Sequence, residues 1–171
     1  MLRINENNQF TLAGTTWTVL DQTEKGTICI ADRIRTMTFG DNNDWRESNI
    51  RKYLNTDFLA AIETEIGADN IIEFERDLLS LDGLDDYGTC MDKVSLINLD
   101  EYRKYRKKIP NTDRWFWMIT PDSTPSNNDS EWMAVVSPSG GVNYFSCHFD
   151  GARGVRPFCI FASCIFESGE K

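Results

Sequence analysis

Residues 115–161 read WFWMITPDSTPSNNDSEWMAVVSPSGGVNYFSCHFDGARGVRPFCIF, and this stretch sets the expected fold class. Four segments rich in apolar residues, 115–120, 132–137, 142–149 and 155–161, are separated by a polar loop and by the turns SPSGG and DGARG. Short strands joined by tight turns are typical of a largely antiparallel sheet. We therefore predict that the final third of the chain is rich in β-structure.

Alternation along the expected strand 142–149 assigns its side chains to two faces. One face is apolar, and we predict that it belongs to the core: Phe145, Cys147 and Phe149. The other face combines polar and aromatic groups, which is the composition expected of a contact surface: Tyr144, Ser146 and His148.

The first half of the chain predicts a hairpin and a helical segment. Residues 16–21 (TWTVLD) and 27–31 (TICIA) flank the turn EKG, which indicates a β-hairpin. Ser48 has the position of an N-cap, and apolar residues then recur at helical spacing as far as residue 66. Either one long helix or two shorter helices fit, because Asn55 is suited to end one and Thr56 to cap the next.

The middle of the chain predicts further strands and a second helix. Residues 71–75 (IIEFE) and 92–98 (DKVSLIN) are strand candidates. Asn98 and Glu101 have capping-box spacing, so we expect a helix over the run that Pro110 ends, with the basic YRKYRKK as its solvated face. These elements indicate one α+β domain over 1–171, with its core in 14–161 and a tail at each end.

The composition argues against several function classes. Hydrophobic residues make up 40% of the 171 residues and aromatic residues 12%, which predicts a folded chain. The formal net charge of −9 argues against binding to nucleic acid and to anionic membranes, because both need basic surfaces. We expect no membrane insertion and no signal peptide, and hence a protein made in a cytoplasm, which is compatible with later association with a virion.

The sequence contains no recognisable catalytic or metal-binding constellation. His148 is the only histidine, and the adjacent Cys147 would point to the opposite face of its strand. The acidic loops at 41–44 and 82–86 lack EF-hand spacing, and Walker A, GxGxxG and GxSxG motifs do not occur. We therefore expect no metal and no cofactor. The five cysteines are expected to be reduced thiols, mostly buried.

Six segments occur in a recognisable order: TTWTVLD from Thr15, WRESNIRKYLN from Trp45, DKVSLIN from Asp92, WFWMITP from Trp115, EWMAVVSPSGGV from Glu131 and GVRPFCIF from Gly154. Together they resemble a bacterial and phage family of unknown function with a C-type-lectin-like fold, whose members read W-x-x-S-x-I-R-x-W-L-N, D-K-V-x-L-L-S, W-W-L-R-S-P and G-V-R-P. This chain differs from that pattern, because Tyr53 replaces a tryptophan, Asn98 a serine and Ile119 an arginine.

The resemblance implies a twisted antiparallel sheet, two flanking helices and long loops. It marks eight residues as a structural motif: Trp45, Ser48, Arg51, Asn55, Trp117, Gly154, Arg156 and Pro157. Gly154 and Pro157 are expected to shape the entry of the last strand. The planar guanidinium of Arg156 is suited to holding a loop through backbone carbonyls or a buried carboxylate.

We expect a non-enzymatic recognition module that binds a protein or a cell-surface glycan, as the receptor-binding and variable proteins of phages in this fold group do. The E-P-N, Q-P-D and W-N-D motifs of calcium-dependent lectins are missing, so we expect calcium-independent binding. Two alternatives stay open: a structural subunit of a homo-oligomer or phage-like particle, and a formylglycine-generating type of enzyme that uses Cys159 or Cys164. The candidate ligand-binding residues are Asn127, Asn128, Trp132, Asn143, Tyr144, Ser146, His148 and Arg153.

Overall fold

The computed structural model describes residues 1–149 and 153–168, which form an α+β structure with two five-stranded sheets. The first sheet has the order β1-β2-β3-β12-β5, and every neighbouring pair in it is antiparallel. Its strands are β1 (Gln9–Leu12), β2 (Thr15–Thr23), β3 (Gly26–Ala31), β12 (Phe158–Phe161) and β5 (Ile71–Ile72). The predicted hairpin is therefore confirmed as β2–β3, whereas β1 was not predicted.

The second sheet has the order β10-β9-β8-β11-β4 and carries most of the final third of the chain. Only the β11–β8 pair is parallel, and the other pairs are antiparallel. Its strands are β10 (Val142–Ser146), β9 (Trp132–Val136), β8 (Phe116–Pro121), β11 (Gly154–Val155) and β4 (Arg35–Thr36). A separate two-stranded sheet pairs β6 (Phe74–Asp77) with β7 (Thr89–Asp92).

The first helical segment is continuous from α1 (Asn49–Tyr53) to α2 (Leu59–Ile66), because a π-helical turn over Leu54–Phe58 joins them. Ser48 caps it as predicted, accepting a hydrogen bond from the Arg51 N–H at 3.0 Å. Thr56 does not cap a second helix. Its hydroxyl donates instead to the Lys52 carbonyl one turn earlier, at 2.7 Å, so the helix passes through this position.

The second helix, α3 (Leu99–Tyr105), begins with the expected capping box of Asn98 and Glu101. The strand expected over 92–98 is wrong, since β7 ends at Asp92 and only Ser95 forms an isolated bridge, with Phe158. Short 3₁₀ turns lie at Trp45–Glu47, Ala68–Asn70, Pro125–Asn127 and Ser163–Ile165.

The segment GVRP carries the chain from one sheet to the other. We expected one strand over 155–161, but Gly154–Val155 pairs in the second sheet and Phe158–Phe161 in the first. Pro157 has no N–H for a ladder, and its carbonyl accepts from the Ala31 N–H at 2.8 Å. Arg156 is buried beside it and donates to the carbonyls of Ala31 and Pro110, which is the use expected of its guanidinium.

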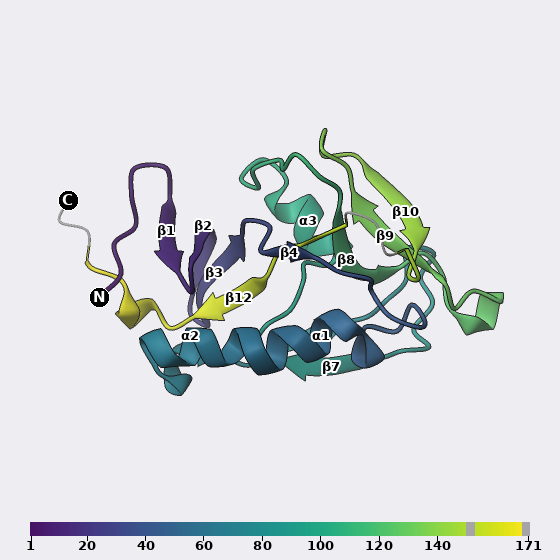
Figure 1. Cartoon of the computed structure of the whole chain (residues 1–171), viewed down its shortest axis with the longest axis horizontal. Coiled ribbons are helices and arrows are strands. Elements are labelled where there is room, and N and C mark those ends of the chain that lie inside the picture. Colours follow the sequence, from purple (N-terminus) through teal and green to yellow (C-terminus); the bar gives the residue numbers. More distant parts are fainter. Residues whose placement is uncertain (150–152, 169–171) are drawn as a thin grey trace.

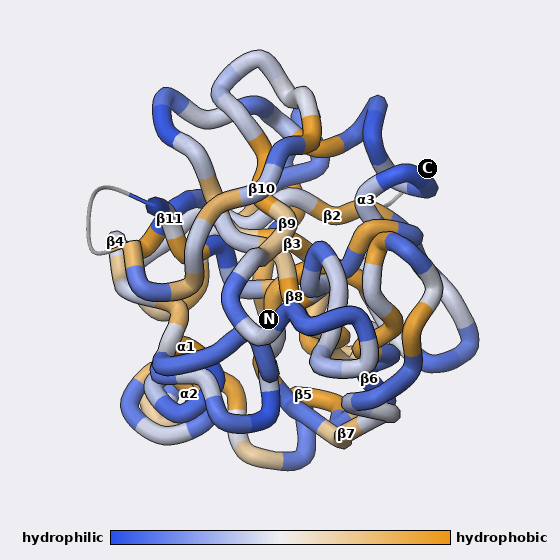
Figure 2. The backbone as a smooth tube through the Cα atoms, turned by 90° about the vertical axis from the view of Figure 1, so that its right-hand side faces the viewer, coloured by the Kyte–Doolittle hydropathy of each residue, from blue (hydrophilic) through white to orange (hydrophobic). Residues whose placement is uncertain are grey.

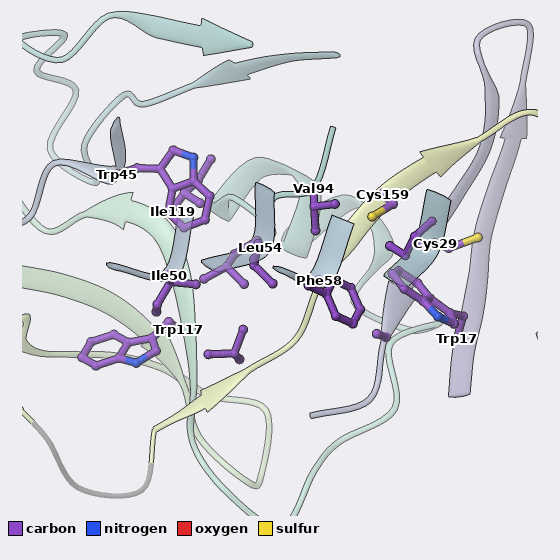
Figure 3. Packing of buried hydrophobic residues seen from close by; sticks show 14 of the residues in the cluster. Trp17, Cys29, Trp45, Ile50, Leu54, Phe58, Val94, Trp117, Ile119 and Cys159 are labelled. Atoms are coloured by element: carbon purple, nitrogen blue, oxygen red, sulfur yellow. The ribbon is translucent and has the colours of Figure 1, made fainter. Parts of the chain in front are cut away.

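The helical run α1–α2 passes beneath strands of both sheets (Figure 1) and packs into a core that they share. Figure 3 shows Ile50, Leu54 and Phe58 of this run between Trp45 and Trp117 at one end and Trp17 at the other. On the opposite face of β8 and β9, α3 contributes Tyr102 and Tyr105 to a second cluster. Hydrophobic residues accordingly follow the central strands, while the outer loops are largely hydrophilic (Figure 2).

A buried polar network explains why the segments WRESNIRKYLN (from Trp45) and DKVSLIN (from Asp92) occur together. Asp92 accepts from the Trp45 indole N–H through one carboxylate oxygen and from Arg51 Nε through the other, both at 2.7 Å. The Asn55 side chain accepts from the Val94 N–H at 3.0 Å and donates to the Val94 carbonyl at 2.8 Å. These bonds hold the helical run against the segment after β7, so the motif residues have a structural role here.

Candidate functional site

Two large aromatic side chains stand exposed on neighbouring strands of the second sheet. Trp132 on β9 is 39% exposed and Tyr144 on β10 is 57% exposed. Their ring centroids lie 5.7 Å apart in an edge-to-face arrangement at 88°. The register pairs Trp132 with Ser146 and Tyr144 with Ala134, which places the side chains of all four on one face of the sheet. The aromatic pair is the centre of the candidate site.

The polar neighbours of this pair are held by carboxylate and carbonyl groups. The Ser146 hydroxyl donates to Glu131 Oε1 at 2.7 Å. His148 Nε2 lies 2.8 Å from the Asp41 carbonyl oxygen, and its Nδ1 lies 3.8 Å from Glu131. The strand ends at Ser146, so His148 belongs to the following turn and does not continue the row that alternation predicted.

The opposite side of β10 corrects two further expectations. Phe149 was assigned to the core but is 41% exposed, because the strand on which that alternation rests has already ended. Arg153 was expected to contact a ligand but is only 8% exposed. Its guanidinium carbon lies 3.8 Å from the Phe145 ring centroid and 4.5 Å from that of Phe149, so it packs against aromatic faces. Asn143, by contrast, is exposed as expected.

The loop between β8 and β9 is anchored by two aspartates of the preceding acidic loop. The Ser123 hydroxyl donates to Asp82 at 2.6 Å, and the Ser126 hydroxyl donates to Asp86 at 2.7 Å. The hydroxyl groups of Ser123 and Ser80 lower the pKa of Asp82, and Ser126 lowers the pKa of Asp86. This loop was expected to offer an adaptable polar surface, but the hydroxyl groups of Ser123 and Ser126 are occupied in fixing its conformation.

The two asparagines predicted as ligand contacts lie at the tip of this loop. Asn127 is exposed and donates to Ser123 Oγ at 3.2 Å, and Asn128 is exposed with a left-handed backbone, φ 53°. Among the described residues, neither asparagine side chain forms a hydrogen bond with Trp132 or Tyr144. Asp82 and Asp86 were not predicted as anchors; the only sequence signal for this role was the presence of serines in the loop between β8 and β9.

A shallow hollow of about 520 Å³ lies on the side of β10 where the strand begins. It contains the two cations Arg103 and Arg106 of the α3 region, in a chain whose net charge is −9. The hollow joins the start of β10 to α3, so the surface around the aromatic pair continues into a cationic region. Its lining residues are Leu81, Leu99, Tyr102, Arg103, Arg106, Gly140 and Val142.

The cysteines divide into buried and accessible thiols, and all five are free. Cys159 is fully buried, and burial raises the pKa of its thiol well above the ordinary value. Burial, assisted by Glu131, raises the pKa of Cys147 to about 11. Cys164 is exposed, so Cys159 and Cys164 do not form an accessible pair. Within residues 1–149 and 153–168, no group of three or more His, Cys, Asp or Glu side chains is arranged to hold a metal ion.

Comparison of the chain with protein-family models, with curated proteins and with solved structures gave no match. In the described part of the chain, no helix has the length and apolar character required to cross a bilayer.

Proposed function

We propose that this chain is a non-enzymatic recognition module, and that Trp132 and Tyr144 form the centre of its contact surface. The exposure of this aromatic pair carries the proposal, because large aromatic rings are the usual anchors of interfaces and are costly to leave in water. Trp132 and Tyr144 stand on paired strands of a sheet buried on both faces elsewhere, so they form a rigid platform that loses little entropy on binding.

The ligand in this proposal is a protein or a cell-surface glycan. Aromatic faces stack on the C–H faces of sugar rings as well as on apolar side chains, and Glu131, which bonds to Ser146 on the same face, supplies a hydrogen-bonding carboxylate at the border. Binding is independent of calcium in this proposal, because Asp82 and Asp86 of one acidic loop anchor serines and Asp44 of the other pairs with Arg46. The six family-like segments support a C-type-lectin-like fold and a role in a phage or phage-derived particle, as a receptor-binding protein.

A thiol enzyme is the weaker candidate. A nucleophilic cysteine requires an accessible thiolate with an activating base, whereas burial raises the pKa of Cys159. The exposed Cys164 has the neutral amide of Asn70 as its hydrogen-bond partner. A structural subunit of a particle would use the same exposed surface for assembly, and the binding experiment below separates the two roles.

The test is binding of the purified protein to a glycan array and to intact bacterial cells, with calcium and with chelator. We expect saturable binding that survives chelator. Trp132→Ala should weaken it by at least about tenfold, because it removes an anchor of the surface. Met91→Ala is the matched control, since Met91 is 48% exposed on β7, in a different sheet. Equal binding by wild type and Trp132→Ala would refute the site, and loss of binding in chelator would refute calcium independence.

A further inference from the structure

Strand β10 is the last strand of its sheet, and its hydrogen-bonding pattern fixes which backbone groups point outward. The Cys147 N–H donates to the Glu131 carbonyl and the Ser137 N–H to the Gly141 carbonyl, both at 2.8 Å. In an antiparallel pair, the backbone groups of alternate residues point toward the neighbouring strand, so the N–H and C=O groups of the odd-numbered residues of β10 point toward β9. By the same alternation, the backbone groups of the even-numbered residues of β9 point toward β8. The bond from the Asp122 N–H to the Trp132 carbonyl, at 2.9 Å, agrees with this assignment.

The even-numbered residues of β10 therefore present their backbone away from the sheet. The N–H and C=O groups of Val142 and Tyr144 form no hydrogen bond with any other residue that the structure describes. At Ser146 the carbonyl accepts from Phe149 through one lone pair and keeps its second, so this residue presents its N–H and one carbonyl lone pair outward. Figure 1 shows β10 beyond β9 at the margin of the molecule. This edge offers a ready template for one more strand.

Nothing in the sequence of this edge discourages such pairing. Monomeric proteins protect edge strands with lysine, proline or a bulge, but VNYFS contains neither residue and pairs with β9 without a break in register. Val142 and Tyr144 are 41% and 57% exposed, so apolar surface accompanies the unpaired backbone. An edge of this kind favours a partner in extended conformation, because only a β-strand can pair with its row of backbone groups.

The charges at the two ends of β10 have opposite signs. Arg103 and Arg106 share the hollow at Val142, where the strand begins. Glu131 bonds to Ser146, where the strand ends, and Asp129 accepts the N–H groups of Glu131 and Trp132. A second copy of this edge is complementary only when it runs antiparallel, because each cationic end then faces an acidic end.

We propose that a second copy of this chain pairs with β10, antiparallel and edge to edge, about a two-fold axis at Tyr144. In this register Tyr144 faces Tyr144 of the second copy, and Val142 faces Ser146 of the second copy. The outward groups of positions 142, 144 and 146 meet in hydrogen-bonded pairs, and the two sheets become one of ten strands. An extended segment of a different protein is the competing occupant, and the mass measurement below separates it from a second copy.

This pairing goes beyond the proposed recognition role and does not depend on it. The axis lies perpendicular to the sheet, so both Trp132–Tyr144 pairs remain on the same side of the dimer. Two adjacent platforms would bind a repetitive cell surface more strongly than one, through the high effective concentration of the second site.

The first experiment is sedimentation of the full chain from micromolar to millimolar concentration. We expect a reversible shift from 19.6 kDa toward twice that mass. Val142→Pro removes an outward N–H at the first residue of the strand, where proline is tolerated, and keeps both aromatic rings. It should raise the dimer dissociation constant by at least about tenfold, while Val142→Thr, which keeps the N–H, should not. A wild-type chain that remains at 19.6 kDa throughout overturns the proposal.

The second experiment tests the register and does not require a stable dimer. Opposed residues of a hydrogen-bonded antiparallel pair have Cα atoms about 5.5 Å apart, within disulfide range. In a Cys164→Ser background, mild oxidation by air or by oxidised glutathione should cross-link Tyr144→Cys into a dimer on a non-reducing gel. Val142→Cys should remain monomeric, because it faces position 146. Equal cross-linking of the two variants, or none by Tyr144→Cys, contradicts this pairing.

Discussion

The network around Asp92 and the edge at β10 combine aromatic and polar groups in opposite ways. Asp92 is 3% exposed, and each of its carboxylate oxygens accepts a bond, one from Trp45 and one from Arg51. Tyr144 is 57% exposed, and its backbone groups have no partner among the described residues. The residue types are similar, so the satisfaction of hydrogen bonds, and not composition, distinguishes the part that holds the fold from the part that we propose for recognition.

The largest expected effect is at Asp92. Asp92→Ala leaves the Trp45 N–H and the Arg51 guanidinium without their acceptor, and should lower the free energy of unfolding by about 3 kcal/mol. Chemical denaturation measures this change. Asp100→Ala is the control, since its pair with Arg103 is exposed and should contribute less than about 0.5 kcal/mol. Similar losses in the two variants would remove the contrast between the network and the surface.

A smaller effect on stability is expected at the exposed pair. Tyr144→Ala removes one edge-to-face ring contact and little buried area, so it should lower the free energy of unfolding by about 1 kcal/mol or less. The same denaturation experiment measures it. A loss of stability as large as that of Asp92→Ala would mean that Tyr144 stabilises the fold, which would contradict our interpretation of it as a surface contact residue.

The smallest effect is expected in the loop anchored by Asp82 and Asp86. The pKa of each is lower in the folded chain than in the unfolded chain, so each stabilises the loop above the unfolded value near about 3.9. That contribution is lost as the pH falls through the folded pKa. We expect Trp132 fluorescence to change below about pH 4 while the core stays folded. The change should be absent from Asp82→Asn/Asp86→Asn, and its persistence there would contradict the assignment.

Local patterns predicted the elements whose bonds lie close together in the sequence. The β2–β3 hairpin, the Ser48 cap and the Asn98–Glu101 capping box are confirmed, because each depends on a few adjacent residues. The exposure of Tyr144 also agrees with alternation, because it lies inside the strand.

Three of the missed features depend on contacts between distant segments. The crossover at Pro157 is set by Ala31, and the aromatic contacts of Arg153 come partly from Trp115. The π-helical turn occurs where Asn55 is bonded to Val94, nearly forty positions later. Alternation failed at Phe149 because the strand ends three residues earlier, which the apolar pattern alone does not indicate.

Binding and stability measured together on Asp92→Ala and Tyr144→Ala test the central claim most directly. Each variant is titrated with the ligand that wild type binds, at a temperature where both are folded. Our account predicts that Tyr144→Ala loses at least about tenfold in affinity with little change in stability, whereas Asp92→Ala loses stability and keeps its affinity. The reverse pattern, or equal affinity in wild type and Tyr144→Ala, would contradict the division between a structural network and a recognition edge.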